Sequence, residues 1–128
     1  MTWHVIIPGQ PVSGNHANKI GRGYRKRNGI SVSYPKLIKT PEAEAYQEAA
    51  AMVIGAAKPS GWTPPEGFLA VEYRLYLTDP VDATNVIKTV EDALAPKIGV
   101  NDRYMMPRCM HIEHGVPNAE ARVEVTIL

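Results

Sequence analysis

The sequence predicts a single α+β domain in which a mixed β-sheet of about four to five strands packs with two main helices. Three observations support this fold class. The chain has 128 residues, enough for one ordinary domain and too few for two. Segments with the alternating apolar residues of strands flank two segments with helical apolar spacing. No internal repeat divides the sequence, so residues 1–128 are expected to form one domain.

The N-terminal third begins with a strand and continues as a loop. Trp3, Val5 and Ile7 alternate along the first predicted strand, and Pro8-Gly9 ends it. Residues 11–39 are rich in glycine, serine, asparagine and basic side chains and have little apolar periodicity, which predicts a basic loop. The Asn28-Gly29 pair inside this loop suits a tight hairpin turn.

The first helix is expected at residues 41–57. Pro41 suits a first helical turn, where Glu42 and Glu44 also interact favourably with the helix dipole. The apolar residues that follow have helical spacing: Ala43, Tyr46, Ala50, Val53 and Ala57.

The remaining elements alternate between strands and a helix. Residues 68–77 predict a half-buried strand, because apolar side chains occupy every second position from Leu69 to Leu77. Residues 83–94 predict a second helix, which Pro96 and Gly99 end. Residues 105–111 and 121–127 predict two further strands.

Charge is distributed unevenly along the chain. Residues 42–128 contain seven basic and thirteen acidic side chains, a balance of −6, whereas residues 1–41 contain seven basic side chains and no acidic one. Such an asymmetry is typical of an element that binds a polyanion, although a solvated basic loop is the simpler interpretation of the charge alone.

The sequence predicts an intracellular, cytoplasmic protein without membrane association. The longest apolar run, residues 49–57, has nine residues, far short of the roughly 20 that a membrane-spanning helix needs. The N-terminus has no basic region followed by an apolar core, so export is not expected. Cys109 is the single cysteine and has no partner for an internal disulfide, which fits a reducing compartment.

Polar side chains gather near the start of the second predicted helix. Asp82 lies at the strand–helix junction, and Asn85, Lys88 and Asp92 follow along one helical flank. Carboxylates beside the amides of a helix start can hold a hydrated divalent cation, and a nearby lysine can meet a phosphate. Asp82 or Thr84 also suits an ordinary helix N-cap, and spacing alone favours that simpler interpretation.

Several short motifs occur in a particular order along the chain. They read Pro11-Val-Ser13-Gly-Asn15, then Thr40 to Tyr46, then Asp82-Ala-Thr84-Asn85-Val-Ile-Lys88, then Asp92-Ala-Leu94, then Asn101-Asp102. In this order they resemble the RusA family of Holliday-junction resolvases, whose signature is an Asp-x-Asp-Asn-x-x-Lys run followed by Asp-x-Leu and an Asn/Asp-Asp pair. The resemblance covers most of the chain, and the shared order carries it more than any single motif.

The resemblance implies a RusA-like fold and a Mg²⁺-dependent endodeoxyribonuclease, a homodimer that resolves four-way DNA junctions by paired nicks. Carried over by position, Asp82 and Asp102 are catalytic metal ligands, Lys88 is the auxiliary cation and Asn85 is a supporting hydrogen-bond group. Thr84 replaces the second aspartate of the family. Its hydroxyl can bind a metal-bound water but carries no charge, so Asp79 or Asp92 is the nearest substitute carboxylate.

Given this resemblance, we expect the basic loop to act as a DNA-binding arm that lies along phosphate backbones. The residues assigned to this role are Asn15, Lys19, Arg22, Arg25, Lys26 and Arg27, with Tyr24 among them. An alternative function is a catalytically impaired, branched-DNA-binding protein of the same fold, with Thr84 as the cause of the lost cleavage. A third possibility, an RNA or protein binder that uses the same arm, has no motif in its favour.

Overall fold

The computed structural model describes residues 2–12 and 18–128. The elements follow in the order β1 (Trp3–Pro8), β2 (Asn18–Arg27), β3 (Ile30–Lys39), α1 (Pro41–Ala57), β4 (Leu69–Leu77), α2 (Ala83–Ile98), the 3₁₀ turn η1 (Asp102–Tyr104), β5 (Met105–His114), the 3₁₀ turn η2 (Asn118–Glu120) and β6 (Arg122–Ile127).

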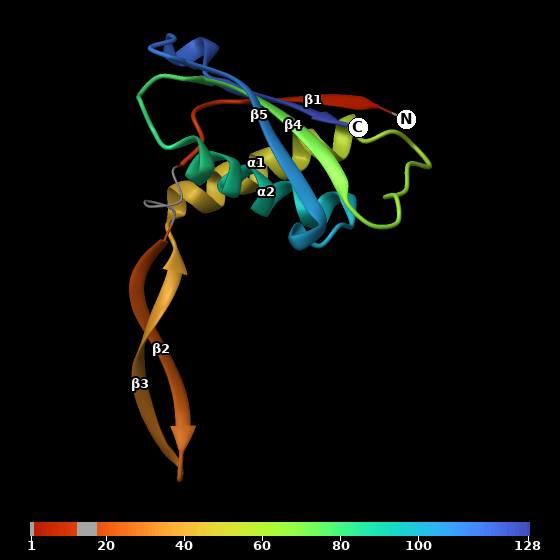
Figure 1. Cartoon of the computed structure of the whole chain (residues 1–128). Helices are drawn as coiled ribbons and strands as arrows, with labels where there is room; N and C mark the ends of the chain where they lie inside the picture. The colour runs from red at the N-terminus through yellow and green to blue at the C-terminus, as the bar shows by residue number, and fades with distance from the viewer. Residues whose placement is uncertain (1, 13–17) are drawn as a thin grey trace.

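The main sheet has four strands in the order β1-β6-β4-β5. The pairs β1–β6 and β4–β6 are antiparallel, whereas β4 and β5 are parallel and α2 connects them. Both helices lie against one face of this sheet (Figure 1). The predicted α+β class and mixed sheet are therefore confirmed. Neither α1 nor α2 has the length and apolar character needed to cross a bilayer, within the described part of the chain.

The core forms where the helices meet the central strand. Every second side chain of β4, from Leu69 to Leu77, is buried, as its alternation predicts. Val86, Val90 and Leu94 of α2 are fully buried at helical spacing and belong to the same apolar cluster. Residues 50 and 54 of α1 are also fully buried in this cluster. Packing of α2 in the core thus fixes which of its flanks remains in water.

The first helix has the predicted bounds and the second is longer than predicted. Thr40 caps α1, and its side-chain oxygen accepts a hydrogen bond from the Ala43 amide. The prediction that α2 ends at residue 94 is wrong, because the helix includes Pro96 and continues to Ile98. Ile98 is buried in the core, which holds the last turn in place. Gly99 then ends the helix with a left-handed backbone, φ 74°.

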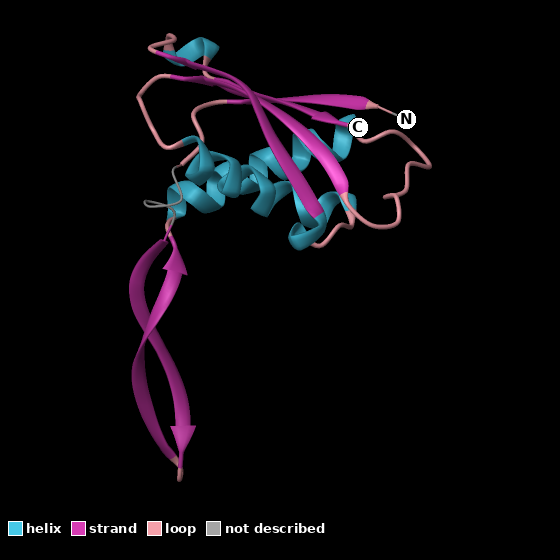
Figure 2. Cartoon of the chain, viewed as in Figure 1, coloured by secondary structure: helices cyan, strands magenta, loops and turns pink. Residues whose placement is uncertain are grey.

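The predicted basic loop is largely a β-hairpin. Within residues 11–39, β2 and β3 pair in antiparallel register from Asn18↔Lys39 to Arg27↔Ile30. Asn28 and Gly29 turn the chain with φ values of 53° and 78°, the positive angles that a two-residue type I′ turn requires. The hairpin forms its own sheet and projects away from the body (Figure 2). Because its side chains pack against no core, the strands lack the burial alternation that reveals a strand in a sequence.

Two glycines let side chains of β3 lie over the backbone of β2. A Cβ added at Gly23 would lie 2.4 Å from Cζ of Tyr34, and one added at Gly21 would lie 2.4 Å from Cδ1 of Ile38. The glycines therefore leave the space that Tyr34 and Ile38 occupy. The guanidinium of Arg25 lies 5.6 Å from the Tyr34 ring centroid, which adds a cation–π contact on this face.

Replacing Gly23 with alanine is expected to displace the Tyr34 ring and loosen the hairpin. Amide hydrogen exchange in β2 and β3 should become roughly fivefold faster, equivalent to a local loss of about 1 kcal/mol. The melting temperature of the body should stay unchanged, because the hairpin is not part of the main sheet. Gly55→Ala in α1 is the control, since its Cβ would come no closer than 3.8 Å to a neighbouring side chain. Unchanged hairpin exchange in Gly23→Ala would contradict this account.

Candidate functional site

The start of α2 positions the first acidic residue. The chain leaves the carboxyl end of β4 at Leu77 and enters α2 at Ala83, with Asp82 as the N-cap. Oδ1 of Asp82 accepts a hydrogen bond from the Thr84 amide at 2.9 Å. This contact satisfies one of the free amides of the helix start and holds the carboxylate beside the positive end of the helix dipole.

Lys88 lies at the centre of the polar flank of α2. Its Nζ donates to Oδ1 of Asp92 at 3.0 Å and to Oδ2 of Asp102 at 3.1 Å. Asp92 is one helical turn further along, whereas Asp102 comes from η1, beyond the end of the helix. Asn101 caps η1 and accepts a hydrogen bond from the Arg103 amide at 3.1 Å. The segment after α2 thus folds back and brings its carboxylate to Lys88.

The electrostatics keep Lys88 charged. The hydrogen bond to Asp92, and then the one to Asp102, raises the pKa of Lys88 above its ordinary value. The three side chains are about half exposed to solvent, at 55% for Lys88, 41% for Asp92 and 49% for Asp102. Exposed ion pairs contribute little to stability. Three charged groups kept accessible to solvent are better suited to meeting a charged ligand than to holding the fold together.

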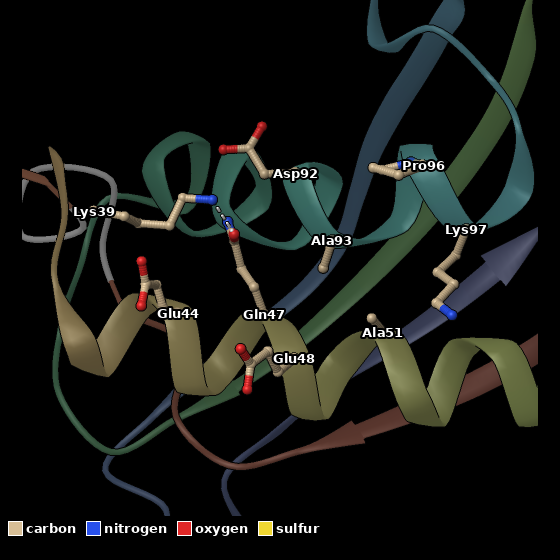
Figure 3. Close-up of a pocket in the computed structure, with 9 residues that line it drawn as sticks. All are labelled: Lys39, Glu44, Gln47, Glu48, Ala51, Asp92, Ala93, Pro96 and Lys97. Carbon is tan, nitrogen blue, oxygen red and sulfur yellow. Dashed lines mark hydrogen bonds between the residues drawn. The ribbon is translucent and has the colours of Figure 1, made fainter. Parts of the chain in front are cut away.

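Two hollows adjoin the Asp92 carboxylate. The smaller, about 330 Å³, lies at the end of α2 and is lined by Glu91, Asp92, Ala95, Pro96, Val100, Asn101 and Asp102. The larger, about 590 Å³, is a groove between α1 and α2 (Figure 3). Glu44, Gln47 and Glu48 of α1 line it, whereas the Asp92 carboxylate points away from α1. Lys39 at the base of the hairpin donates a hydrogen bond to Gln47. Asp92 therefore borders both hollows, one that it shares with Asp102 and one that it shares with Lys39 at the base of the hairpin.

The N-terminal segment also reaches α2. The buried hydroxyl of Thr89 donates to the Val12 carbonyl at 2.7 Å, which holds residue 12 beside the helix. Val12, in the Pro11 to Asn15 motif, therefore lies beside α2. Asn15, assigned to DNA binding from the sequence, lies outside the described residues. The five basic residues with the same assignment, Lys19, Arg22, Arg25, Lys26 and Arg27, are all exposed on the hairpin.

The structure brings together only some of the residues that the sequence singled out. Lys88 and Asp102 are in direct contact, and Asp92 joins them. Asp82 has no ion pair with Lys88 within the described structure, and it lies six residues earlier, about 9 Å along the helix axis. Thr84 is exposed one turn before Lys88, so the row 84, 88 and 92 follows one flank. Asn85 is partly buried, and its carbonyl accepts a hydrogen bond from the Thr89 hydroxyl.

Comparison with known proteins identifies the family. The family model described as endodeoxyribonuclease RusA matches residues 8–128. The chain belongs to the RusA family. No curated protein sequence matches the chain. The RusA match spans the hairpin, both helices and the Lys88 cluster, so all of them belong to the fold of a DNA-cutting enzyme.

RusA nucleases are generally metal-dependent, and the donor atoms here suit Mg²⁺ in kind. Carboxylate and hydroxyl oxygens are the ligands that Mg²⁺ takes, and one or two protein carboxylates suffice where a substrate phosphate supplies more oxygens. Among residues 2–12 and 18–128, no three His, Cys, Asp or Glu side chains converge on one point. The donor atoms therefore suit Mg²⁺ in kind, and the described residues contain no preformed group of three such ligands.

Glu91 is the residue near this RusA site that sequence reasoning missed. Only 8% of it is exposed, and its Oε1 is buried without a hydrogen-bond partner among the described residues. Burial raises the pKa of Glu91, whereas the nearby charge of Lys88 lowers it. Its spacing from Ile87, Leu94 and Ile98 places it on the apolar side of α2, a signal that was readable in the sequence.

Glu91→Gln is expected to stabilise this RusA-family protein at neutral and alkaline pH but not in acid. The folded-state pKa of Glu91 is raised, so ionisation as the pH rises costs the native state stability, and glutamine removes that cost. Urea unfolding should show a variant advantage on the order of 1 kcal/mol at pH 8 that disappears below the ordinary glutamate pKa of 4.5. Exposed Glu66→Gln is the control. An advantage that is independent of pH would show that ionisation of Glu91 is not its cause.

Proposed function

We propose that the protein is a Mg²⁺-dependent endodeoxyribonuclease that resolves Holliday junctions by paired nicks. The observation that carries this proposal is the meeting of Lys88 with Asp102 on the exposed flank of α2, in a chain of the RusA family. The helix start at Asp82 and the return of η1 supply acidic oxygens at a solvent-accessible surface, as phosphodiester hydrolysis requires. A lone cysteine and a DNA substrate both fit a cytoplasmic enzyme.

In this proposal Asp82, Asp102 and Thr84 hold Mg²⁺ on the DNA-facing flank of α2. When bound, the metal supplies Lewis acidity to a phosphate oxygen and makes a water nucleophilic near neutral pH. Lys88 neutralises a phosphate oxygen or orients the attacking water, because its raised pKa keeps the ammonium charged. Asn85 supports the neighbouring ligands by hydrogen bonding. The cations of the hairpin bind the phosphates of the DNA arms.

We propose a homodimer as the working unit. A four-way junction must be cut in two opposite strands, which a two-fold dimer with one site in each subunit matches. The edge strand β5 supports this: residues 106, 110 and 112 are apolar and 42–50% exposed, and one edge of the strand has no partner in the main sheet. Sedimentation of the protein in solution measures the oligomeric state.

Cleavage of a synthetic four-way junction with Mg²⁺ tests the proposed site. Asp82→Asn, Asp102→Asn and Lys88→Ala should each lower the cleavage rate by about 100-fold or more, because each removes charge that acts on the reacting phosphate. Their stability should change by less than about 1 kcal/mol, since the Lys88 ion pairs are exposed and asparagine caps a helix about as well as aspartate does. Lys97→Ala, on the same helix, is the control and should cut normally. Equal cleavage by wild type and all three site variants would remove the assignment.

The alternative function, a branched-DNA-binding protein without cleavage, is favoured by one observation. Thr84 is exposed one helical turn before Lys88, where it contributes no charge. Thr84→Asp separates the two functions. If the wild type binds junctions without cutting them, and Thr84→Asp cuts with Mg²⁺, the protein is a scaffold whose missing ligand has been restored. If the wild type already cuts, the added carboxylate should strengthen Mg²⁺ binding and lower the Mg²⁺ concentration needed for half-maximal cleavage.

A further inference from the structure

The two faces of the β2–β3 hairpin are built differently. On one face, here the closed face, Tyr34 and Ile38 cover the glycine backbone of the opposite strand. The other, here the open face, carries Ile20, Tyr24 and Leu37, which are 81%, 69% and 68% exposed. Ile20 and Leu37 are direct cross-strand partners. Tyr24 lies four residues closer to the hairpin turn than Ile20 and on the same face. Three large apolar side chains thus remain in water on an arm that has no core to bury them.

The charges around these residues select the kind of partner. Arg22 and Lys26 lie two positions on either side of Tyr24, so the three side chains share the open face. Residues 18–39 contain seven basic side chains and no acidic one, and three of the seven, Arg22, Lys26 and Lys39, lie on the open face. A second hairpin packed on this face would bring like charges together at a cost, whereas nucleic acid would neutralise them. The surface therefore fits a polyanion that also offers apolar area.

Stacked duplex DNA offers phosphates to an approaching ribbon but keeps its base faces covered. A branch point differs, because the base pairs at the strand exchange can lose a stacking neighbour and expose apolar base faces. Each hairpin strand has ten residues, about 33 Å, and a two-stranded ribbon is narrow enough to enter a DNA groove. The arm is thus long enough to reach from the body into the centre of a bound junction.

We propose that the open face packs on unstacked bases at the branch point, with Tyr24 stacked on a base and the Ile20–Leu37 pair beside it. Arg22 and Lys26 bind the flanking phosphates. This inference rests on the proposed function, which supplies the junction, and adds to it a means of telling a junction from a linear duplex. Aromatic–base stacking needs no particular base, so the preference is for the branched shape rather than for a sequence.

Binding in EDTA, which prevents cutting, tests the inference on the full-length protein. The probes are a four-way junction with 2-aminopurine at the branch point and a linear duplex of the same sequence. Tyr24→Ala should weaken junction binding on the order of 10- to 100-fold, change duplex binding by less than about twofold and abolish the change in 2-aminopurine fluorescence that the wild type causes. Tyr24→Phe should behave as the wild type, because it keeps the ring. Ile20→Ala should give a smaller loss for the junction alone.

Two control variants separate this contact from the charge and from the fold. Ile30→Ala removes a comparably exposed side chain, 67%, from the opposite face and should leave junction binding unchanged. Arg22→Ala should weaken binding to both DNAs and reduce the slope of log affinity against log salt by about 1, whereas Tyr24→Ala should not alter the slope. Hydrogen exchange of the hairpin amides identifies any variant whose hairpin has unfolded. If this happens in Tyr24→Ala, Tyr24→Ser is used in its place.

Three results would overturn the inference. They are equal losses for junction and duplex in Tyr24→Ala, unchanged junction binding in that variant, and a change in its sedimentation mass, which would assign the open face to contact between subunits. Failure of the proposed function itself looks different, because the wild type would then bind the junction in EDTA with its change in 2-aminopurine fluorescence intact and still not cut the junction when Mg²⁺ is added.

Discussion

Burial of the apolar face of α2 in the core is the interaction on which the site depends. Val86, Val90 and Leu94 anchor one side of the helix in the core, so the opposite flank, with Lys88 and Asp92, must face water. Because β4 and β5 are parallel, the chain has to return along the helix before β5 begins. After the helix ends, the turn at Gly99 folds the chain back so that Asp102 reaches Lys88. A helix packed at another rotation about its axis would bury the lysine and separate it from η1.

Lys88 also explains how two carboxylates can lie close together in this cluster. An ammonium between Asp92 and Asp102 neutralises part of their charge, so the two acids can lie within reach of one group without strong mutual repulsion. A cluster balanced in this way is stable before DNA arrives. In the proposed mechanism a DNA phosphate offers Lys88 a third negative partner besides Asp92 and Asp102, and the flexible lysine stem allows it to change partners.

Local patterns predicted the body of the domain well, because its elements are amphipathic and their apolar residues face one core. The α1 helix has the predicted bounds, since Pro41 and the Thr40 cap mark its start. The end of α2 was wrong because the buried Ile98 outweighs the presence of Pro96. The strand β5 extends beyond residue 111 because it is held by backbone pairing with β4, and its side chains are mostly exposed. For the same reason the sequence indicates the hairpin only by its Asn28-Gly29 turn and does not predict the length of its strands.

The candidate site was predictable as a set of residues and not as an arrangement. Helical spacing places Lys88 and Asp92 together, but the contact with Asp102 depends on how the chain turns after Gly99. The role of Asp82 in capping the helix was foreseen, as was its place after a strand. Glu91 was overlooked because it was counted among the charged residues rather than placed on the apolar side of its helix.

The separation of the hairpin from the main sheet has a consequence for how such proteins diversify. Its ladder of backbone hydrogen bonds begins and ends within residues 18–39, so changes in its length or surface leave the layers of the body undisturbed. With the roles proposed above for the hairpin and α2, selection can change which nucleic-acid shapes the hairpin binds while the chemistry on α2 stays the same. An engineer can exploit the same independence by exchanging one arm for another on an unaltered scaffold.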